Sequence, residues 1–281
     1  YTTMRLPTEP PRINGVLDDS CWQEGSWAGG FNQVSPYEGN PPSQETEFKI
    51  LYDNKYIYVA IRCHDTEPEK IEIRKAPRDS YAGDITGIAF DSYFDHRTAF
   101  EFTLTAAGGK LDVVHQSIGK FDWNWDAVWD GKTALEDSAW TAEMKIPFSQ
   151  LRYPDKNEQV WGLHSWRIIY RLGEINHFNL IPRDAPLLVP LFGELYGITG
   201  LKKFRRIELM PYTVGKLDVF KKEPENPFTE KGRKLVYSLG IDGKIGLASN
   251  ITLDFTVNPD FGQVEADPSV MNLTAFEVFY Q

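Results

Sequence analysis

Alternation of apolar and polar residues with a period of two is the feature that most limits what this chain can fold into. Tyr, Phe, Val and Ile recur at every second position in most periodic segments. Half-buried β-strands require this pattern because their side chains point to opposite faces in turn. In "FKILYDNKYIYVAIRCHD" (48–65), two such runs flank Asp53, Asn54 and Lys55, a composition typical of a tight turn. The alternation therefore predicts an all-β protein, with a hairpin at this position.

Further alternating segments supply enough strands for two packed sheets. They are "TAFEFTLTAAGGKLDVVHQSIG" (98–119), "AWTAEMKIPFSQL" (139–151), "VWGLHSWRIIYRL" (160–172) and "GELYGITGL" (193–201). Their number matches an antiparallel β-sandwich, which we place at residues 1–203. Long irregular connections lie at 23–46, 64–84 and 172–193, and such loops often carry the binding residues of a sandwich.

The segment after Leu201 differs, with longer alternating runs separated by polar turns. In "RKLVYSLGIDGKIGL" (233–247), Leu235, Tyr237, Leu239 and Ile241 share one face, and "NITLDFTVNPDF" (250–261) repeats the pattern. Runs of about ten residues with one apolar face are typical of transmembrane β-barrel strands, but also of ordinary antiparallel sheets. Residues 204–281 are therefore predicted to begin a second β domain, either outer-membrane barrel strands or a soluble β extension.

Charge and motif content argue against several functions. The chain carries 40 acidic and 30 basic side chains, a net charge of −10, which repels phosphate backbones, so nucleic acid is not an expected partner. The sequence contains no apolar run of transmembrane-helix length and no signal peptide. Because it begins at Tyr1 rather than Met, we expect an upstream segment. The motifs G-x-S-x-G, G-x-G-x-x-G and the P-loop are absent from the sequence.

The two cysteines, Cys21 and Cys63, allow one disulfide bond. They are equally consistent with a bonded pair in an oxidising compartment and with two small buried apolar residues. Their number and spacing do not indicate a metal site.

Six stretches together resemble the carbohydrate-binding module family 9-like domain, in the form found at the front of large Bacteroidetes-type outer-membrane proteins. They occur in the family's order between residues 12 and 201: "RINGVLDDSCW", "FKILYDNKYIYVAIRCHD", "IAFDSYFDHRTAFEFTLTAAG", "WDAVWD", "WTAEMKIPFSQLRY" and "FGELYGITGL". A later stretch, "TVNPDFGQVEADPSVMNLTAFEVF" (256–279), resembles the region that joins this module to a following barrel-like domain. The resemblance implies that residues 204–281 start such a barrel and that the chain stops before its end.

The fold of that family is an antiparallel β-sandwich, often supported by calcium, which holds a sugar between aromatic side chains and is not a catalyst. Carried over to this sequence, one clamp aromatic falls on Tyr81, just before "DITGIAFD" (84–91), and the other on Phe178 in a late loop. Arg78 and Asp84 are the polar neighbours that the resemblance implies. The family has tryptophan at both clamp positions, whereas this chain has a tyrosine and a phenylalanine.

The segment "FDWNWDAVWD" (121–130) places three tryptophans within seven residues. In an extended strand their rings would share one face, so the segment provides either a sugar platform or part of the core. Trp125 and Trp129 belong to the family-like "WDAVW" and are predicted to fill the core. Trp123 precedes that match in a loop-like context and is the platform candidate.

Three acids and one arginine complete the set of candidate site residues. Asp84, Asp91 and Asp95 lie near one another in the sequence, and calcium takes about six to eight oxygen ligands of this kind. A calcium site and an acidic, solvated turn are the two interpretations of these aspartates. Arg183 lies on the same loop as Phe178, where it could bind sugar hydroxyls or pair with Asp184.

Together these features predict a non-catalytic, carbohydrate-binding β-sandwich in an extracytoplasmic protein, secreted or associated with the outer membrane, that serves polysaccharide utilisation. Two alternatives stay open: a cap or plug for an outer-membrane barrel without a sugar ligand, and a component of a glycoside hydrolase. An exposed aromatic pair facing one groove would favour sugar binding over the structural role.

Overall fold

The computed structural model describes residues 1–116, 119–201, 207–219, 221, 232–248 and 251–259. The chain divides into two compact units, Tyr1–Phe204 and Arg205–Gln281, and each is described separately. Most of the stretch that resembles the start of a barrel-like domain (256–279) lies outside the described residues.

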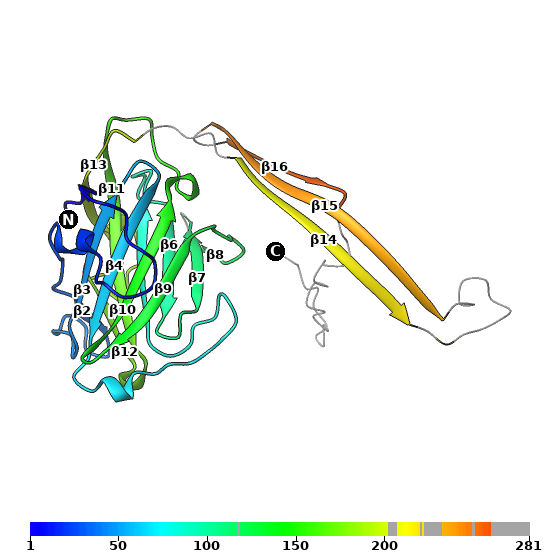
Figure 1. Ribbon diagram of the computed structural model, residues 1–281. Helices are drawn as coiled ribbons and strands as arrows, with labels where there is room; N and C mark the ends of the chain where they lie inside the picture. The colour runs from blue at the N-terminus through cyan, green and yellow to red at the C-terminus, as the bar shows by residue number, and fades with distance from the viewer. Residues whose placement is uncertain (117–118, 202–206, 220, 222–231, 249–250, 260–281) are drawn as a thin grey trace, which may run out of the picture. The chain divides into compact units, whose positions relative to one another are not determined.

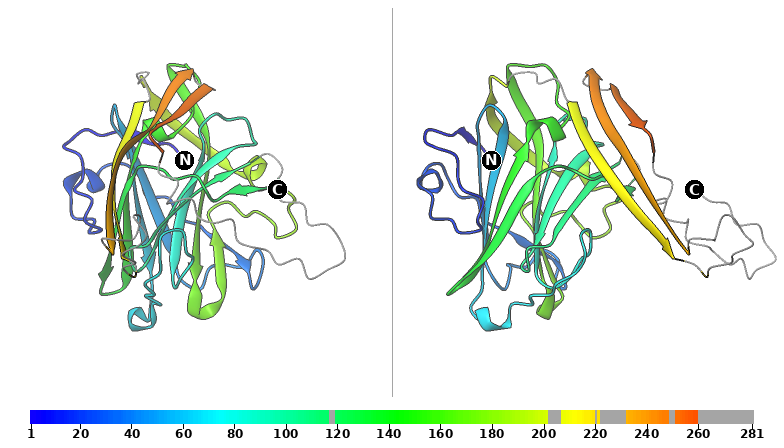
Figure 2. Two further views of the ribbon diagram at one scale, coloured as in Figure 1. Left: turned by 90° about the vertical axis from the view of Figure 1, so that its right-hand side faces the viewer. Right: turned by 45° about the vertical axis from the view of Figure 1, so that its right-hand side comes forward.

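The first unit is an antiparallel β-sandwich of two sheets (Figures 1 and 2), as the alternation predicted. Its smaller sheet has the strand order β1-β3-β4-β10-β9. These strands are β1 (Met4–Arg5), β3 (Thr46–Tyr52), β4 (Tyr56–His64), β9 (Asp130–Glu136) and β10 (Ala139–Pro147). Strands β3 and β4 form the predicted hairpin around Asp53 to Lys55. In this sheet β1 pairs with β3 in parallel, and the other neighbouring strands are antiparallel.

The larger sheet has the order β2-β12-β11-β5-β6-β7-β8, with β13 also paired to β11. Its strands are β2 (Asn32–Ser35), β5 (Ile85–Asp91), β6 (Ala99–Thr105), β7 (Lys110–His115), β8 (Phe121–Asp122), β11 (Glu158–Ile169), β12 (Glu174–His177) and β13 (Gly193–Thr199). All neighbouring strands in this sheet are antiparallel.

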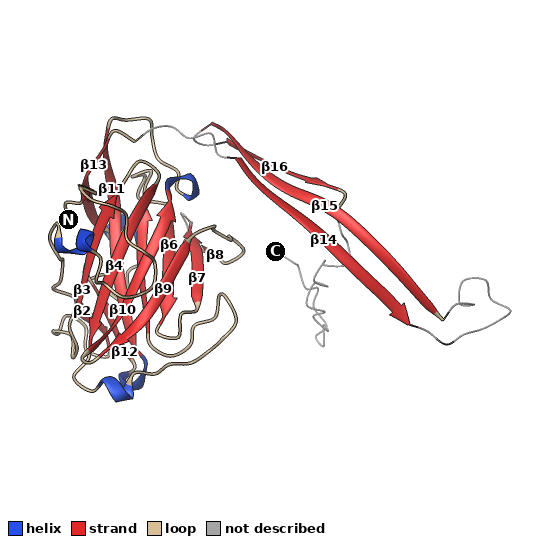
Figure 3. Ribbon diagram, viewed as in Figure 1, coloured by secondary structure: helices blue, strands red, loops and turns tan. Residues whose placement is uncertain are grey.

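Short 3-10 helices lie in the loops at the margins of the sheets (Figure 3). They are η1 (Ser20–Gln23), η2 (Pro68–Lys70), η3 (Phe148–Gln150), η4 (Tyr170–Leu172) and η5 (Val189–Leu191). In the part of the chain that the structure describes, none of the helices is long and apolar enough to cross a membrane.

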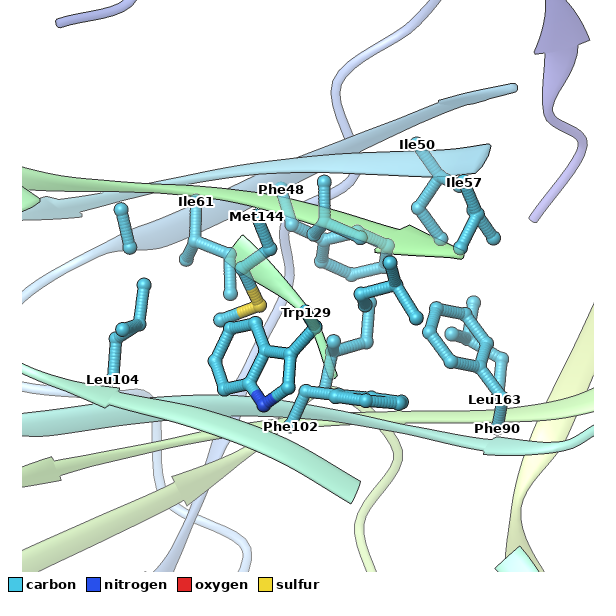
Figure 4. Close-up of a cluster of buried hydrophobic side chains, with 14 of the residues drawn as sticks. Phe48, Ile50, Ile57, Ile61, Phe90, Phe102, Leu104, Trp129, Met144 and Leu163 are labelled. Carbon is cyan, nitrogen blue, oxygen red and sulfur yellow. The ribbon is translucent and has the colours of Figure 1, made fainter. Parts of the chain in front are cut away.

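The hydrophobic core lies between the two sheets (Figure 4). Phe48 and Met144 project from the smaller sheet, and Phe102 and Leu163 project from the larger one. All four side chains are fully buried. Burying a side chain of this size contributes about 1.5–3 kcal/mol, so the facing layers account for much of the stability of the sandwich.

The N-terminal stretch "RINGVLDDSCW" is held against the smaller sheet by the buried carboxylate of Glu143. Its oxygens accept hydrogen bonds from the backbone N–H groups of Asn14 (3.0 Å) and Gly15 (2.8 Å) and from Nε1 of Trp22 (2.8 Å). Gly15 has a φ of +91°, and a Cβ atom there would lie 2.5 Å from the carbonyl carbon of Thr133. The glycine and the tryptophan of this stretch therefore serve the fold.

The two cysteines lie in different parts of the sandwich. Cys21 packs with Leu17 and Trp22 on the far side of the smaller sheet, whereas Cys63 lies in the core between the sheets. Both are free thiols, and burial raises the pKa of each to about 11. The structure therefore agrees with the interpretation as two small buried residues rather than a disulfide.

The second unit contains a three-stranded antiparallel sheet of β14 (Ile207–Val219), β15 (Arg233–Ala248) and β16 (Ile251–Val257). The pairing register gathers large apolar side chains on one face: Ile207, Leu209, Leu217, Leu235, Tyr237, Leu239, Ile241, Ile245, Leu253, Phe255 and Val257. Most of these side chains are exposed, Leu239 by 71%. We call this surface the apolar face of the second unit.

Candidate functional site

The outer face of the larger sheet, which is turned away from the core, carries large side chains beside a band of small ones. The small residues are Gly87 and Ala89 on β5, and the register places Trp166 beside Gly87 and His164 beside Ala89. A Cβ atom at position 87 would lie 2.7 Å from Nε1 of Trp166. Glycine at this position therefore lets the Trp166 indole lie across the strand.

Three exposed rings at this face form a contiguous row, the aromatic strip (Phe121, Trp123 and Tyr81). The ring centroids of Phe121 and Trp123 are 5.8 Å apart, as are those of Trp123 and Tyr81. Tyr81 also lies 6.2 Å from Trp166. The three residues are 42%, 46% and 46% exposed, respectively. Because Tyr81 and Trp123 are nearly perpendicular, at 80°, they form an aromatic corner open to solvent.

A buried polar pair lies next to the strip. Oε2 of Glu101 on β6 is 2.7 Å from Nε2 of His115 on β7, and Oε1 accepts a hydrogen bond from Oγ1 of Thr103 (3.1 Å). The His115 ring contacts Phe121 of the aromatic strip, with centroids 4.9 Å apart. The aromatic strip therefore lies directly beside the Glu101–His115 pair, which can form hydrogen bonds.

Two more histidines share this face, His164 on β11 and His177 on β12. Their ring centroids are 4.5 Å apart, and Nδ1 of each is buried without a hydrogen-bond partner among the described residues. Burial lowers the pKa of both rings, that of His177 to about 4, although the Glu101 carboxylate acts in the opposite direction. Both rings are therefore neutral at pH 7, and each holds a buried ring nitrogen that no described residue bonds.

Asp112 on β7 anchors the tryptophan-rich segment 121–130. Its Oδ2 accepts the backbone N–H of Ala127 (2.6 Å), and its Oδ1 accepts the indole N–H of Trp129 (3.1 Å). Trp125 packs against the core and Trp129 belongs to it, which confirms their prediction as core residues. Trp123 stays outside, on the aromatic strip, so the segment contributes to both the core and the outer face.

The predicted clamp between Tyr81 and Phe178 is not formed. Phe178 directly follows His177, and the alternation of side chains sends its ring to the core side of the sheet. There it packs edge-on against Phe48, with centroids 4.8 Å apart. Tyr81 lies on the opposite face, and Trp123 is the ring beside it. The structure therefore corrects Phe178 from a clamp residue to one packed against the core.

Arg78 and Asp84, the polar neighbours implied for Tyr81, form structural contacts. Arg78 donates a hydrogen bond to Oδ1 of Asp112. Asp84 is fully buried, and its Oδ1 accepts the backbone N–H of Tyr170 (3.1 Å). The first contact ties a loop to β7 and the second ties the residue before β5 to η4, so the structure gives both residues a role in holding the framework of the site.

Arg183 likewise connects two loops. Its guanidinium donates to the carbonyl oxygen of Pro36 (2.6 Å) and lies 3.8 Å from a carboxylate oxygen of Glu38. Its partner is therefore the loop after β2, not Asp184 as one of the two interpretations had it.

The acids predicted to bind calcium do not form one site. Asp91 accepts the backbone N–H of His96 (2.8 Å), and Asp95 accepts that of Arg97 (2.8 Å), so both close the turn between β5 and β6. Asp84 lies at the other end of β5, roughly 20 Å away at about 3.3 Å per residue. This ligand set therefore does not fit a calcium ion. Within the described ranges, no three His, Cys, Asp or Glu side chains are placed to hold a metal.

The site residues predicted from the sequence lie in or beside loops, whereas further large polar and aromatic side chains of this face lie within strands. Glu101, His164 and Trp166 occupy alternate positions in "AFEFTLT" and "LHSWR", opposite to side chains that face the core. A charged or bulky polar side chain on the outer face of a central strand is a signal that could have identified them.

Fold and site together define an antiparallel β-sandwich with an aromatic strip on the outer face of its larger sheet. The family model described as "Carbohydrate family 9 binding domain-like" matches residues 13–166, more than half of the chain. The chain belongs to this family. A second model, described as "Domain of unknown function (DUF5916)", matches residues 204–281.

Solved structures show the same fold at low sequence identity. A carbohydrate binding module family 9 from Caldicellulosiruptor kristjanssonii, in complex with glucose, has a TM-score of 0.51 and 16% identity, and the match covers 72% of this chain and 98% of that one. A structure in complex with cellotriose from the same organism has a TM-score of 0.50 and 17% identity, covering 70% and 95%. A putative carbohydrate-binding protein from Bacteroides uniformis ATCC 8492 has a TM-score of 0.56 and 12% identity, covering 70% and 98%. No curated protein matches the chain.

Proposed function

We propose that the sandwich binds carbohydrate on the outer face of its larger sheet. The observation that carries this proposal is the aromatic strip, three contiguous rings that are each at least 42% exposed. Exposed apolar patches that adjoin polar groups mark binding surfaces more often than chance. Membership of the family, and the two related modules that hold glucose and cellotriose, support the same proposal.

The aromatic corner and the polar groups suit the two kinds of surface that a sugar presents. Trp123 and Tyr81 offer ring faces for stacking on C–H groups, while the Glu101–His115 pair beside the strip supplies groups that can bond hydroxyls. Both rings are held by neighbouring aromatic side chains, so little side-chain entropy is lost when a ligand arrives.

A glycan array followed by calorimetry on the strongest ligand tests the proposal. Tyr81→Ala and Trp123→Ala are each expected to weaken binding by about 1–3 kcal/mol, because aromatic contacts dominate small interfaces. Tyr37→Ala is the matched control, since Tyr37 is 66% exposed and outside the strip. If no glycan binds, the structural cap or plug becomes the better interpretation. Release of reducing ends from a bound glycan would favour the glycoside hydrolase alternative.

We further propose that the second unit supplies strands of an outer-membrane β-barrel, which would make the protein extracytoplasmic. Strands β14 and β15 have 13 and 16 residues, longer than the roughly 9–11 that cross a bilayer. The apolar face fits lipid, while the opposite face carries Lys216, Asp242 and Lys244, as a barrel interior does.

Flotation of the chain with phosphatidylcholine vesicles tests this second proposal. Leu239→Lys places a charge on the apolar face and should reduce co-flotation strongly, because a lysine facing lipid costs about 2–4 kcal/mol near the bilayer centre. Ser238→Lys places the same charge on the opposite face and should float as the unsubstituted chain does. Equal flotation of the two variants, or none by the unsubstituted chain, would contradict a lipid-facing role.

A further inference from the structure

A basic hollow adjoins the end of the aromatic strip. It lies between the β5–β6 turn, residues 119–121 and the segment that enters η5, and its lining includes His96, Arg97, His115, Lys120, Phe121 and Leu187. Phe121 and His115 belong both to this hollow and to the outer-face site. A ligand stacked on the strip can therefore extend into the hollow without leaving the surface.

The charge in the hollow is of one sign. No acidic side chain of the described residues lines it, although the whole chain has a net charge of −10. Arg97 and Lys120 form no ion pair within the described parts of the chain. Other arginines, such as Arg62 and Arg171, are paired with carboxylates. The hollow thus concentrates uncompensated positive charge on an acidic protein.

Local structure keeps the neighbouring acids away from these two cations. Asp95 precedes Arg97 by two residues, but its Oδ1 accepts the backbone N–H groups of Arg97 (2.8 Å) and Thr98 (2.9 Å). Glu101 bonds His115 and Thr103 beneath the strip. Both carboxylates are already engaged, so the exposed Arg97 and Lys120 are left available to an anionic ligand.

We infer that the ligand of this site is an acidic glycan, whose carboxylate or sulfate group lies at the mouth of the basic hollow while a sugar ring stacks on the aromatic strip. The inference rests on the proposed carbohydrate binding and specifies its ligand class. A guanidinium offers paired N–H donors to a carboxylate or sulfate, and the lysine adds a second positive charge. A neutral glycan would leave both cations to water and would gain no affinity from their charge.

The test compares acidic and neutral glycans that share one backbone. Oligogalacturonate and its methyl ester form one pair, and oligoalginate, glucuronoxylan oligosaccharides and sulfated carrageenan oligosaccharides extend the set and separate carboxylate from sulfate. At least one acidic member is expected to bind. Its affinity should fall at least tenfold when its charge is masked, or when the ionic strength is raised to about 1 M.

Arg97→Gln combined with Lys120→Gln should weaken binding of that acidic glycan at least tenfold. Lys132→Gln combined with Lys156→Gln is the matched control, since it removes the same charge from exposed positions outside the hollow and should change affinity less than twofold. Tryptophan fluorescence during thermal unfolding checks that each double variant is folded.

The outcomes separate the two proposals. One contrary result is a neutral glycan that binds best, with an affinity that falls on substitution of Tyr81 or Trp123 but is unchanged by the Arg97/Lys120 double substitution. In that case the inference about charge is wrong and carbohydrate binding stands. The same holds if an acidic glycan binds equally well to the Arg97/Lys120 variant. If no glycan of either kind binds, both proposals are overturned.

Discussion

The two units of this protein share the same alternation of apolar and polar residues, but they bury its apolar side to very different extents. Phe102 in the sandwich is fully buried, whereas Leu239 on β15 is 71% exposed. In the sandwich, a second sheet covers the apolar face, and the described residues of the second unit provide one sheet only. Alternation of apolar and polar residues thus specifies an apolar face of a sheet, but it does not specify what covers that face.

The largest expected effect separates the buried face from the exposed one. Phe102→Ala removes a ring that packs against Trp125 and Trp129, and it should lower the free energy of unfolding by about 3–5 kcal/mol. Urea unfolding followed by tryptophan fluorescence measures this loss, because every tryptophan lies between residues 22 and 166. A loss below about 1 kcal/mol would contradict the description of this layer as a tightly packed core.

A second substitution tests whether the outer face depends on a buried anchor. Asp112→Ala leaves the indole N–H of Trp129 and the backbone N–H of Ala127 without their acceptor. The free energy of unfolding should fall by about 2–3 kcal/mol, because the two lost hydrogen bonds, worth about 1.5–3 kcal/mol each, are partly offset by removing the cost of burying the carboxylate. Asp122→Ala, in the neighbouring β8, is a control expected to stay within about 0.5 kcal/mol.

A third prediction concerns pH and the buried histidines. The pKa of His177 is lowered from 6.5 to about 4, so between these values the unfolded chain binds more protons than the folded one. The stability from neutral His177 is present above pH 6.5 and is lost as the pH falls toward 4. When the pH falls from 7 to 5, the free energy of unfolding of the His177→Gln variant should therefore fall by about 2 kcal/mol less than that of the unsubstituted chain.

Urea unfolding at pH 7 and pH 5 provides the comparison. Burial raises the pKa of Asp112 and Glu143, so their contribution has the opposite slope, and the difference between the two proteins isolates His177. Parallel pH profiles for the variant and the unsubstituted chain would contradict the assignment of a buried, neutral ring.

The smallest effect is expected on the apolar face of the second unit. Leu239→Ala should change the stability of the sandwich by less than about 0.5 kcal/mol, because an exposed side chain loses little contact. The same fluorescence assay measures it. A loss comparable to that of Phe102→Ala would contradict the description of Leu239 as exposed, and the contrast between the units would disappear.

The sequence predicted the sandwich because its period-two pattern depends only on neighbours along the chain. It did not predict which side chains at the end of β12 point outward. A shift of one residue decides whether His177 or Phe178 lies on the outer face. The sequence did separate Trp123 from Trp125, through the family-like match, but it did not predict the hydrogen bonds from Ala127 and Trp129 to Asp112 that hold this segment. Tyr81 and Trp123 were predicted as separate candidates, and their contact with each other was not.

Asp112 also joins two loops that approach the site from different parts of the chain. It bonds Arg78, three residues before Tyr81, and Ala127, four residues after Trp123. The two rings of the aromatic corner are thus positioned by one carboxylate that is itself part of the folded interior. Such a surface is preorganised: its loops are ordered when the sandwich folds, and a ligand needs to order little more than itself.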